Sequence, residues 1–294
     1  MVTQSRFGLS CALALPLTNQ LEIDDARLTA HVRRCLQTGC SSVTLFGTTG
    51  EGASVSLAER HRVLDALSAA GVSLSQHVLG GVAAASVGDA ALQAQALVDR
   101  DCRGVLLAPP FYFKGVTEGG LYKWFAQVFA ATGDRVHDVI LYNIPAVTQV
   151  PLPVSLIKRL KADFPKVVAG VKDSGSDWAY TENLLSAGDD LIVLIGNERH
   201  LAAGIRQGAH GAICGLANLC PEILSDQIKG EIEDFRIAEL STEFMRFPFV
   251  AAVKAVLANR LKDPGWSKVR PPLEELSEAD AAELLRTYDR IASR

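Results

Sequence analysis

The sequence lacks any marked excess of charge and any long hydrophobic run. Its 294 residues include 29 Lys and Arg against 33 Asp and Glu, a formal net charge of -4. No basic run is longer than Arg33–Arg34, so the chain offers little counterion release on binding nucleic acid. No stretch approaches the roughly 20 apolar residues that cross a bilayer. These absences argue against a nucleic-acid partner and against an integral membrane protein.

Paired cysteines and metal-binding motifs are also missing. The six cysteines form no C-x-x-C pair, and the six histidines are scattered, with no H-E-x-x-H. Such spacing gives neither a disulfide framework nor a metal site. We therefore expect buried, apolar cysteines in a cytoplasmic protein, and we predict no metal and no cofactor.

Short apolar, β-branched segments recur along the chain, and each is typical of a strand buried on both faces. They span residues 8–15, 42–46, 77–82, 104–108, 139–142, 167–171, 191–195 and 211–214. Segments with helical spacing separate them, among them 24–37, 57–70, 88–101, 118–131 and 152–163. Regular alternation of strand and helix predicts an α/β fold with a parallel sheet.

Eight alternating strands match a (β/α)8 TIM barrel, and the main competing architecture is a doubly wound open sheet. The dinucleotide fingerprint of the open sheet, G-x-G-x-x-G, is absent, since the glycine-rich turn at residues 47–52 has a different spacing. We therefore favour the barrel. After Cys220 the strand pattern gives way to helical segments. We predict a barrel over residues 1–220 and a C-terminal helical appendage, packed on the barrel, over residues 221–294.

A lysine ends the sixth predicted strand. In a TIM barrel the reactive groups lie at the C-terminal ends of the strands, and residues 167–171 lead directly into Lys172. A lysine in a low-dielectric site is more readily a free amine, which can attack a carbonyl and form a Schiff base. The alternative is a surface lysine at a strand end.

Two further strand ends carry groups suited to the same chemistry. The fifth strand ends in YNIP at residues 142–145, where the phenol of Tyr142 either shuttles protons or packs at the rim. The second strand runs into GTTGE at residues 47–51. There glycines let the backbone approach a ligand, and hydroxyl and N–H groups can hold a carboxylate. A capping-box pattern, Ser56 to Glu59, then opens a helix.

With these motifs the chain resembles the dihydrodipicolinate synthase / N-acetylneuraminate lyase family of pyruvate-dependent class I aldolases. The resemblance rests on GTTGE at 47–51, PPFY at 109–112, YNIP at 142–145 and GVKDS at 170–174, with further matches at 211–213 and 270–272. These matches run in order along nearly the whole chain. The resemblance implies a Schiff-base aldolase or lyase that needs no cofactor and forms a homotetramer.

The resemblance also implies catalytic roles for four residues. Lys172 matches the Schiff-base lysine, which condenses with the C2 carbonyl of pyruvate or a longer 2-oxo acid. Tyr142 matches the tyrosine that moves protons. Thr48 matches the hydroxyl that links this tyrosine to a second one, and Tyr112 fits that second role, reaching in from a neighbouring subunit.

Substrate-binding positions are implied in the same way. Gly47 and Thr49 match the turn that grips the pyruvate carboxylate. Ile213 matches the residue whose carbonyl lies beside the lysine, and Gly196 matches the glycine at the end of the seventh strand.

The second substrate distinguishes the members of this family. Its synthases place an arginine two residues after the proline of YNxP to receive aspartate semialdehyde, but this chain has Val147, which cannot make that bidentate contact. Glu198 and Arg199 follow the seventh strand, where the lyases read a polyhydroxylated tail. Arg199 suits a 2-keto-3-deoxy sugar acid or a 4-hydroxy-2-oxo diacid. Alternatively, Glu198 and Arg199 form an exposed ion pair at a helix start.

We therefore predict an aldolase or lyase that cleaves or forms a 2-oxo acid, with pyruvate as product or donor and an aldehyde as partner. A 4-hydroxy-tetrahydrodipicolinate synthase stays open as an alternative, as does a dehydratase that uses the same imine. The alternative from another class is a non-catalytic 2-oxo acid binding protein.

Overall fold

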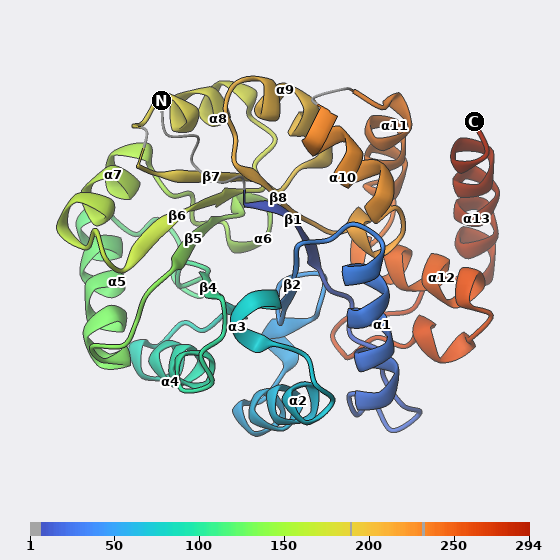
Figure 1. The fold of residues 1–294 in the computed structure, drawn as a ribbon, viewed down its shortest axis with the longest axis horizontal. Coiled ribbons are helices and arrows are strands. Elements are labelled where there is room, and N and C mark those ends of the chain that lie inside the picture. Colours follow the sequence, from blue (N-terminus) through green and yellow to red (C-terminus); the bar gives the residue numbers. More distant parts are fainter. Residues whose placement is uncertain (1–6, 189, 231–232) are drawn as a thin grey trace.

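A computed structural model of the chain describes residues 7–188, 190–230 and 233–294. Eight parallel strands close into a barrel in sequence order, with the last strand paired to the first (Figure 1). The strands are β1 (Gly8–Ala12), β2 (Ser42–Leu45), β3 (Val78–Val82), β4 (Gly104–Leu107), β5 (Val139–Asn143), β6 (Val168–Asp173), β7 (Ile192–Ile195) and β8 (Gly211–Cys214). The predicted TIM barrel is confirmed.

Two strand boundaries differ from the prediction in ways that concern the site. The predicted sixth strand, the apolar run 167–171, ends in Lys172, and β6 continues to Asp173 because both residues are paired with β5 and β7. The first strand is shorter than predicted and ends at Ala12. The apolar run beyond it stays buried outside the sheet, where Leu17 forms an isolated bridge with Ile23.

Helices connect successive strands and surround the barrel (Figure 1). They are α1 (Asp25–Gln37), α2 (Leu57–Ala69), α3 (Leu74–His77), α4 (Val87–Val98), α5 (Glu118–Thr132), α6 (Pro145–Thr148), α7 (Val154–Asp163), α8 (Trp178–Leu185), α9 (Leu201–Arg206) and α10 (Pro221–Gly230). Helix α10 packs against β1 and α9, so it occupies the place of the barrel helix that follows β8. The boundary between barrel and appendage predicted at residue 220 therefore lies before this helix. In the described ranges, none of the helices combines the length and apolarity needed to cross a membrane.

Local sequence signals fix where the first helices begin. Asp24 precedes α1, and its side chain accepts a hydrogen bond from the N–H of Arg27. Ser56 and Glu59 form the predicted capping box at the start of α2, each side chain accepting from the other residue's N–H. Helix α2 therefore begins at a fixed point after the turn that carries Thr48.

Apolar side chains fill two layers. Inward-facing residues from β1, β3, β4, β5, β7 and β8 pack inside the barrel: Ala12, Leu79, Leu106, Ile140, Tyr142, Leu194 and Ile213. A larger layer between the strands and the helices contains the outward-facing residues. All six cysteines are buried and free, as predicted. The barrel is thus a packed core, and substrate access is confined to its rim.

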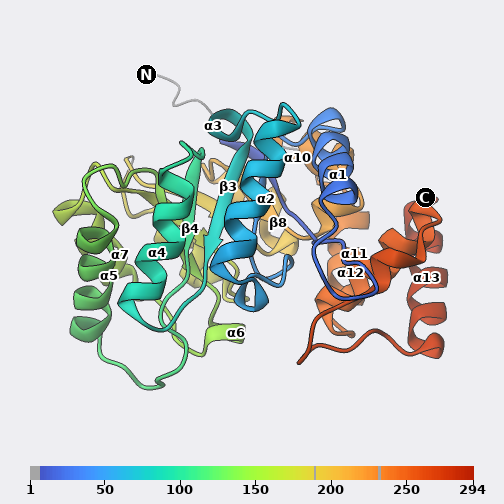
Figure 2. The same cartoon turned by 90° about the horizontal axis from the view of Figure 1, so that it is seen from below.

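The C-terminal appendage lies on one side of the barrel (Figure 2). It contains α11 (Phe235–Phe244), α12 (Phe249–Leu261) and α13 (Glu278–Ala292), with the short turn η4 (Pro264–Ser267) between the last two. Helix α11 packs against η2 (Glu198–His200), and α12 packs against η3 (Leu216–Asn218). Because η2 and η3 follow β7 and β8, the appendage borders the C-terminal ends of these strands.

Candidate active site

The ends of β5 and β6 bring Tyr142 and Lys172 side by side. The two residues are register partners in the sheet, and both are buried, with exposed fractions of 5% and 4%. Lys172 Nζ donates a hydrogen bond to Tyr142 Oη at 3.1 Å and lies 4.2 Å from the centre of the tyrosine ring. The structure therefore places an amine and a phenol within proton-transfer distance of each other.

The residues that follow these two on each strand face the opposite side and fix the strand ends. Asn143 and Asp173 are also register partners, and Asn143 Nδ2 donates to Asp173 Oδ1 at 2.8 Å. Thr181 Oγ1 donates to the other oxygen of Asp173 at 2.8 Å. Side chains alternate across a strand, so this outer pair locks the two strands whose inner side chains are Tyr142 and Lys172.

The turn after β2 brings Thr48 to the phenol. Thr48 Oγ1 lies 3.4 Å from Tyr142 Oη. The turn is held by hydrogen bonds from the N–H of Glu51 to Thr48 O at 3.1 Å and from the N–H of Gly52 to Gly47 O at 3.0 Å. A Cβ at Gly52 would lie 1.7 Å from the carbonyl oxygen of Phe46, so this tight turn requires glycine there.

The surroundings of Tyr142 favour its ionised form. Burial acts to raise the pKa of Tyr142, but the positive charge of Lys172 and hydrogen bonds involving Thr48, Lys172 and Ser174 outweigh it. The pKa of Tyr142 is therefore below its ordinary value. A lowered pKa makes the phenol a better proton donor and increases the fraction of phenolate that can accept a proton.

Gly196 leaves room for the lysine. A Cβ at this position would lie 2.8 Å from Lys172 Cε and 2.1 Å from Ser174 Oγ. The N–H of Gly196 donates to the carbonyl of Asp173 at 2.7 Å, which ties the end of β7 to β6. Any larger residue would push the lysine side chain aside.

Glu198 and Arg199 differ in exposure. Glu198 is 6% exposed and accepts a hydrogen bond from the N–H of Leu216 at 2.9 Å, whereas Arg199 is exposed. The two residues are thus no exposed ion pair, and that alternative is wrong. Burial raises the pKa of Glu198, an effect that backbone N–H groups and the charge of Lys172 offset only in part.

A cavity of about 190 Å³ joins these groups. Seven predicted site residues line it: Thr48, Thr49, Tyr142, Lys172, Gly196, Glu198 and Arg199. Residues not predicted complete its wall, namely Ser174, Ser176 and Asn197 from the barrel and Ser241, Met245 and Phe249 from the appendage. The cavity lining thus combines the amine of Lys172 with hydroxyl, amide and guanidinium groups.

A second cavity of about 320 Å³ adjoins the first. Thr48, Tyr142, Ile144 and Val147 line both, and Gly47 lines the second. The second cavity is lined largely by apolar side chains. Tyr142 borders this cavity as well as the cavity that contains Lys172.

Three predicted residues do not line the lysine cavity: Gly47, which lines the second cavity, Tyr112 and Ile213. Tyr112 is 73% exposed and stacks edge-on against Phe113 at 5.3 Å between ring centres. Ile213 is fully buried in the barrel interior together with Tyr142. Within one chain, Tyr112 is therefore not brought to Thr48.

Sequence reasoning missed several residues that shape this site. Ser174, Asn143 and Asp173 stand inside the YNIP and GVKDS motifs, so their position beside the reactive residues was a usable signal. Ser241 and Met245 come from the appendage and had no local signal. Among residues 7–188, 190–230 and 233–294, no cluster of three or more His, Cys, Asp or Glu side chains could hold a metal ion.

An amine, a phenol and a threonine hydroxyl in this geometry can form and hydrolyse an imine with a carbonyl compound. The amine supplies the nucleophile, and the phenol supplies and removes protons. The nearby turn offers N–H and hydroxyl groups to an anionic substituent on that carbonyl compound.

Comparisons with known proteins agree with this geometry. Residues 6–290 match the Dihydrodipicolinate synthetase family. The chain is 30% identical over 295 residues to a DapA-like lyase of Chloroflexus aurantiacus, covering 97% of this chain and 96% of that protein. It is 30% identical over 267 residues to the 4-hydroxy-tetrahydrodipicolinate synthase of Thermus thermophilus, covering 85% of each. Among solved structures it is similar to the dihydrodipicolinate synthase from Agrobacterium tumefaciens str. C58, with a TM-score of 0.95 and 44% identity over 97% of this chain and 99% of that one.

Proposed function

The chain belongs to the dihydrodipicolinate synthetase family and is a lyase, and from this premise we propose that it makes or breaks a carbon–carbon bond of a 2-oxo acid through an imine at Lys172. Pyruvate is the product or the donor, and an aldehyde is the partner. One observation carries the proposal: Lys172 is buried, lies 3.1 Å from the hydroxyl of Tyr142 and forms no ion pair within the described ranges.

The cleavage direction runs as follows. Lys172 Nζ attacks the C2 carbonyl carbon of the bound 2-oxo acid, and the carbinolamine loses water to give the imine. Tyr142 Oη delivers and removes the protons of these steps. The C3–C4 bond then breaks, its electron pair forming an enamine, while the C4 hydroxyl loses its proton and becomes the aldehyde. Protonation at C3 and addition of water to the imine release pyruvate.

The turn after β2 is the proposed holder of the substrate carboxylate. Thr48 and Thr49 both line the lysine cavity, and Thr49 is 6% exposed. Backbone N–H groups and hydroxyls of a tight turn bind anions well. A carboxylate there would leave the neighbouring C2 carbonyl facing Lys172.

Polar groups in the cavity lining support a polyhydroxylated or diacidic substrate. Ser176, Asn197, Arg199 and Ser241 line the cavity and offer hydrogen bonds to hydroxyl groups. The guanidinium of Arg199 can also pair with a distal carboxylate. A 2-keto-3-deoxy sugar acid or a 4-hydroxy-2-oxo diacid fits these groups, and loss of water from such a compound through the same imine stays open.

Reductive trapping tests the imine directly. The protein is incubated with pyruvate and borohydride, and the adduct is located by peptide mass spectrometry in wild type, Lys172→Met and the exposed-lysine control Lys166→Met. We expect a pyruvyl adduct on Lys172 in wild type and in Lys166→Met, and none in Lys172→Met. Folded wild-type protein that gives no adduct at high pyruvate excess would overturn the proposal.

A non-catalytic binding protein is separated from an enzyme by Tyr142→Phe. The enzyme proposal expects pyruvate to bind this variant, while exchange of the pyruvate methyl protons with D₂O falls by about 10²–10⁴-fold because a general acid–base is lost. Proton exchange is followed by NMR and needs no second substrate. Retained exchange would contradict the proton-transfer role of Tyr142.

Condensation with aspartate semialdehyde is a second candidate, favoured by the similarity to the Thermus and Agrobacterium synthases. Against it, the apolar Val147 lines the cavity and is 59% exposed, where a bidentate carboxylate contact would need arginine. We expect wild type to condense aspartate semialdehyde poorly and to release pyruvate from a 2-oxo acid in a screen. The reverse result would make the synthase the better assignment.

We also propose that the protein is a homotetramer in the cytoplasm. The exposure of Tyr112 and Phe113, 73% and 69%, supports a role for Tyr112 across a subunit contact. The free cysteines support a reducing compartment. Sedimentation velocity of wild type, combined with proton exchange by Tyr112→Phe mixed with Lys172→Met, tests whether Tyr112 acts in the neighbouring subunit's site.

A further inference from the structure

Glu51, the last residue of the GTTGE motif, connects the catalytic turn to the C-terminal appendage. Its N–H donates to Thr48 O at 3.1 Å and so closes the turn. Its carboxylate binds two groups of the appendage: Oε1 accepts a hydrogen bond from Lys254 Nζ at 2.6 Å, and Oε2 accepts one from the N–H of Arg270 at 2.7 Å. One residue therefore joins the turn to two points of the appendage.

The backbone conformation of Glu51 and the burial of its carboxylate are both energetically unfavourable, which indicates that the contacts around the residue hold it in place. Its backbone is in the left-handed region, with φ of 50°, an unfavourable conformation for a residue with a side chain. Its carboxylate is 2% exposed and the Lys254 side chain is fully buried. A buried ion pair loses hydration on both sides and is kept only where several hydrogen bonds satisfy it.

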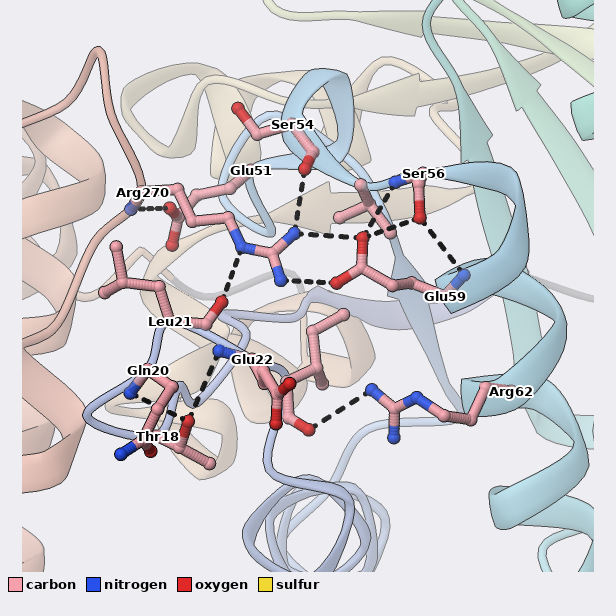
Figure 3. A network of polar contacts seen from close by, with 12 residues as sticks. Thr18, Gln20, Leu21, Glu22, Glu51, Ser54, Ser56, Glu59, Arg62 and Arg270 are labelled. Atoms are coloured by element: carbon pink, nitrogen blue, oxygen red, sulfur yellow. Dashed lines mark hydrogen bonds and ion pairs between the residues drawn. The ribbon is translucent and has the colours of Figure 1, made fainter.

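Arg270 extends the connection to the start of α2. Its guanidinium donates to Glu59 Oε1 at 2.5 Å, to Ser54 O at 2.8 Å and to Leu21 O at 2.9 Å. Figure 3 shows Arg270 between Glu51 and Glu59, with the loop carrying Leu21 beside it. The appendage thus clamps the turn through residues that do not line the lysine cavity, although Glu51 and Ser54 line the second cavity.

The appendage also contacts the turn on its cavity side. A Cβ placed on Gly215 would meet the ring of Phe249 at 2.4 Å and Thr49 Oγ1 at 3.2 Å, so both groups pack against this glycine. Phe249 opens α12, the helix that carries Lys254. Movement of α12 would therefore move both the Glu51 carboxylate and the wall beside Thr49.

We propose that Glu51 is a positioning residue that, through Lys254 and Arg270, holds the Thr48–Thr49 turn in the orientation that binds the carboxylate of the 2-oxo acid. The inference rests on the proposed function and adds to it a role for the appendage. Glu51 lines the second cavity but not the lysine cavity, and it forms no hydrogen bond with Lys172 within the described residues. Its loss should weaken recognition of the carboxylate and leave the amine's reaction with a carbonyl intact.

Two carbonyl compounds separate these effects. Pyruvate and acetone both form an imine with lysine, but acetone has no carboxylate. Glu51→Gln keeps the size of the side chain and removes its charge. We expect the pyruvate concentration for half-maximal borohydride trapping to rise about tenfold or more, because small displacements of binding groups have large effects, with acetone trapping unchanged.

A matched control disrupts the appendage elsewhere. Arg27 Nε donates to Asp263 Oδ2 at 2.7 Å and ties η4 to α1, without reaching the turn. Arg27→Met should leave the ratio of pyruvate to acetone trapping at the wild-type value. If Glu51→Gln does not fold, the neutral pair Glu51→Gln/Lys254→Met, which buries no charge, serves for the same measurement.

The outcomes are distinct. Wild-type protein that traps neither compound removes the proposed function and the inference with it. If wild type traps pyruvate and the Glu51 variant needs the same pyruvate concentration for half-maximal trapping, the inference is overturned and the proposed function stands. An equal loss of pyruvate and acetone trapping also overturns it, since that result places Glu51 in general stability rather than in carboxylate binding.

Discussion

Lys172 and Lys254 are both buried, with exposed fractions of 4% and 0%, but their surroundings differ. Lys254 pairs with Glu51 at 2.6 Å. The polar partner of Lys172 is the hydroxyl of Tyr142, and within the described ranges no carboxylate forms an ion pair with it. A buried lysine that is bonded to a carboxylate serves structure, whereas one that is bonded only to a phenol beside a cavity is placed to meet a substrate carbonyl.

Replacement of Lys172 gives the largest expected effect on activity. In Lys172→Met we expect exchange of the pyruvate methyl protons to fall by about 10⁴-fold or more, as on loss of a nucleophile. We expect no loss of stability, because the change removes a buried polar group that lacks an ionic partner. NMR exchange and thermal unfolding measure the two. A strongly destabilised Lys172→Met would show that this lysine also holds the fold.

Replacement of Lys254 should give the opposite pattern. Lys254→Met leaves the Glu51 carboxylate buried without its cation, and we expect a loss of about 3–5 kcal/mol in the free energy of unfolding. Urea unfolding measures the loss. The double variant Glu51→Gln/Lys254→Met should recover most of it. Wild-type stability in Lys254→Met would mean that the ion pair contributes little.

The pKa of Tyr142 should respond to the loss of Lys172 and not to the loss of Lys254. Burial acts to raise this pKa, and the charge of Lys172 is the strongest effect acting against it. In Lys172→Met the pKa of Tyr142 should therefore rise, so that the phenolate appears at higher pH than in wild type. In Lys254→Met it should stay unchanged. Ultraviolet difference titration, with the matching Tyr142→Phe variants as baselines, follows the phenolate.

The smallest expected effect concerns acid stability at the clamp. Partial burial acts to raise the pKa of Glu59, but hydrogen bonds from Arg270 and Ser56 lower it from 4.5 to about 2. A folded-state pKa below the unfolded value stabilises the protein above the unfolded pKa, and this contribution is lost as pH falls through the folded one. The stability difference between wild type and Arg270→Met should thus be full above about pH 5 and shrink toward pH 2. Thermal unfolding across this range measures it, and a constant difference would contradict the assignment.

The sequence was sufficient to predict the barrel and the main part of the site. Apolar strand segments alternate with amphipathic ones, and the C-terminal ends of parallel strands converge at one rim. Residues at the ends of β2, β5, β6 and β7 therefore meet without any long-range information. Thr48, Tyr142, Lys172 and Gly196 lie together for this reason, and their proposed roles remain to be tested.

Other features could not be predicted because they depend on contacts distant in the chain. Glu51 and Lys254 are 203 residues apart, and no local pattern links them. The apolar pattern of the sixth strand leads into Lys172 and stops there, so it did not show that the strand continues to Asp173. The structure keeps Asp173 in the strand because both neighbouring strands pair with it. Tyr112 does not line the lysine cavity of its own chain, and its role in a neighbouring subunit stays a prediction.

The separation between Glu51 and its partners has a consequence for synthesis of the chain. The last barrel strand ends at Cys214, so a nascent chain holds every strand before the ribosome has added residue 254. At about 5–20 residues per second the interval lasts about 2–8 s. During this interval the Glu51 carboxylate has neither Lys254 nor the N–H of Arg270 as a partner, so the Thr48–Thr49 turn lacks the contacts that hold it in the complete chain.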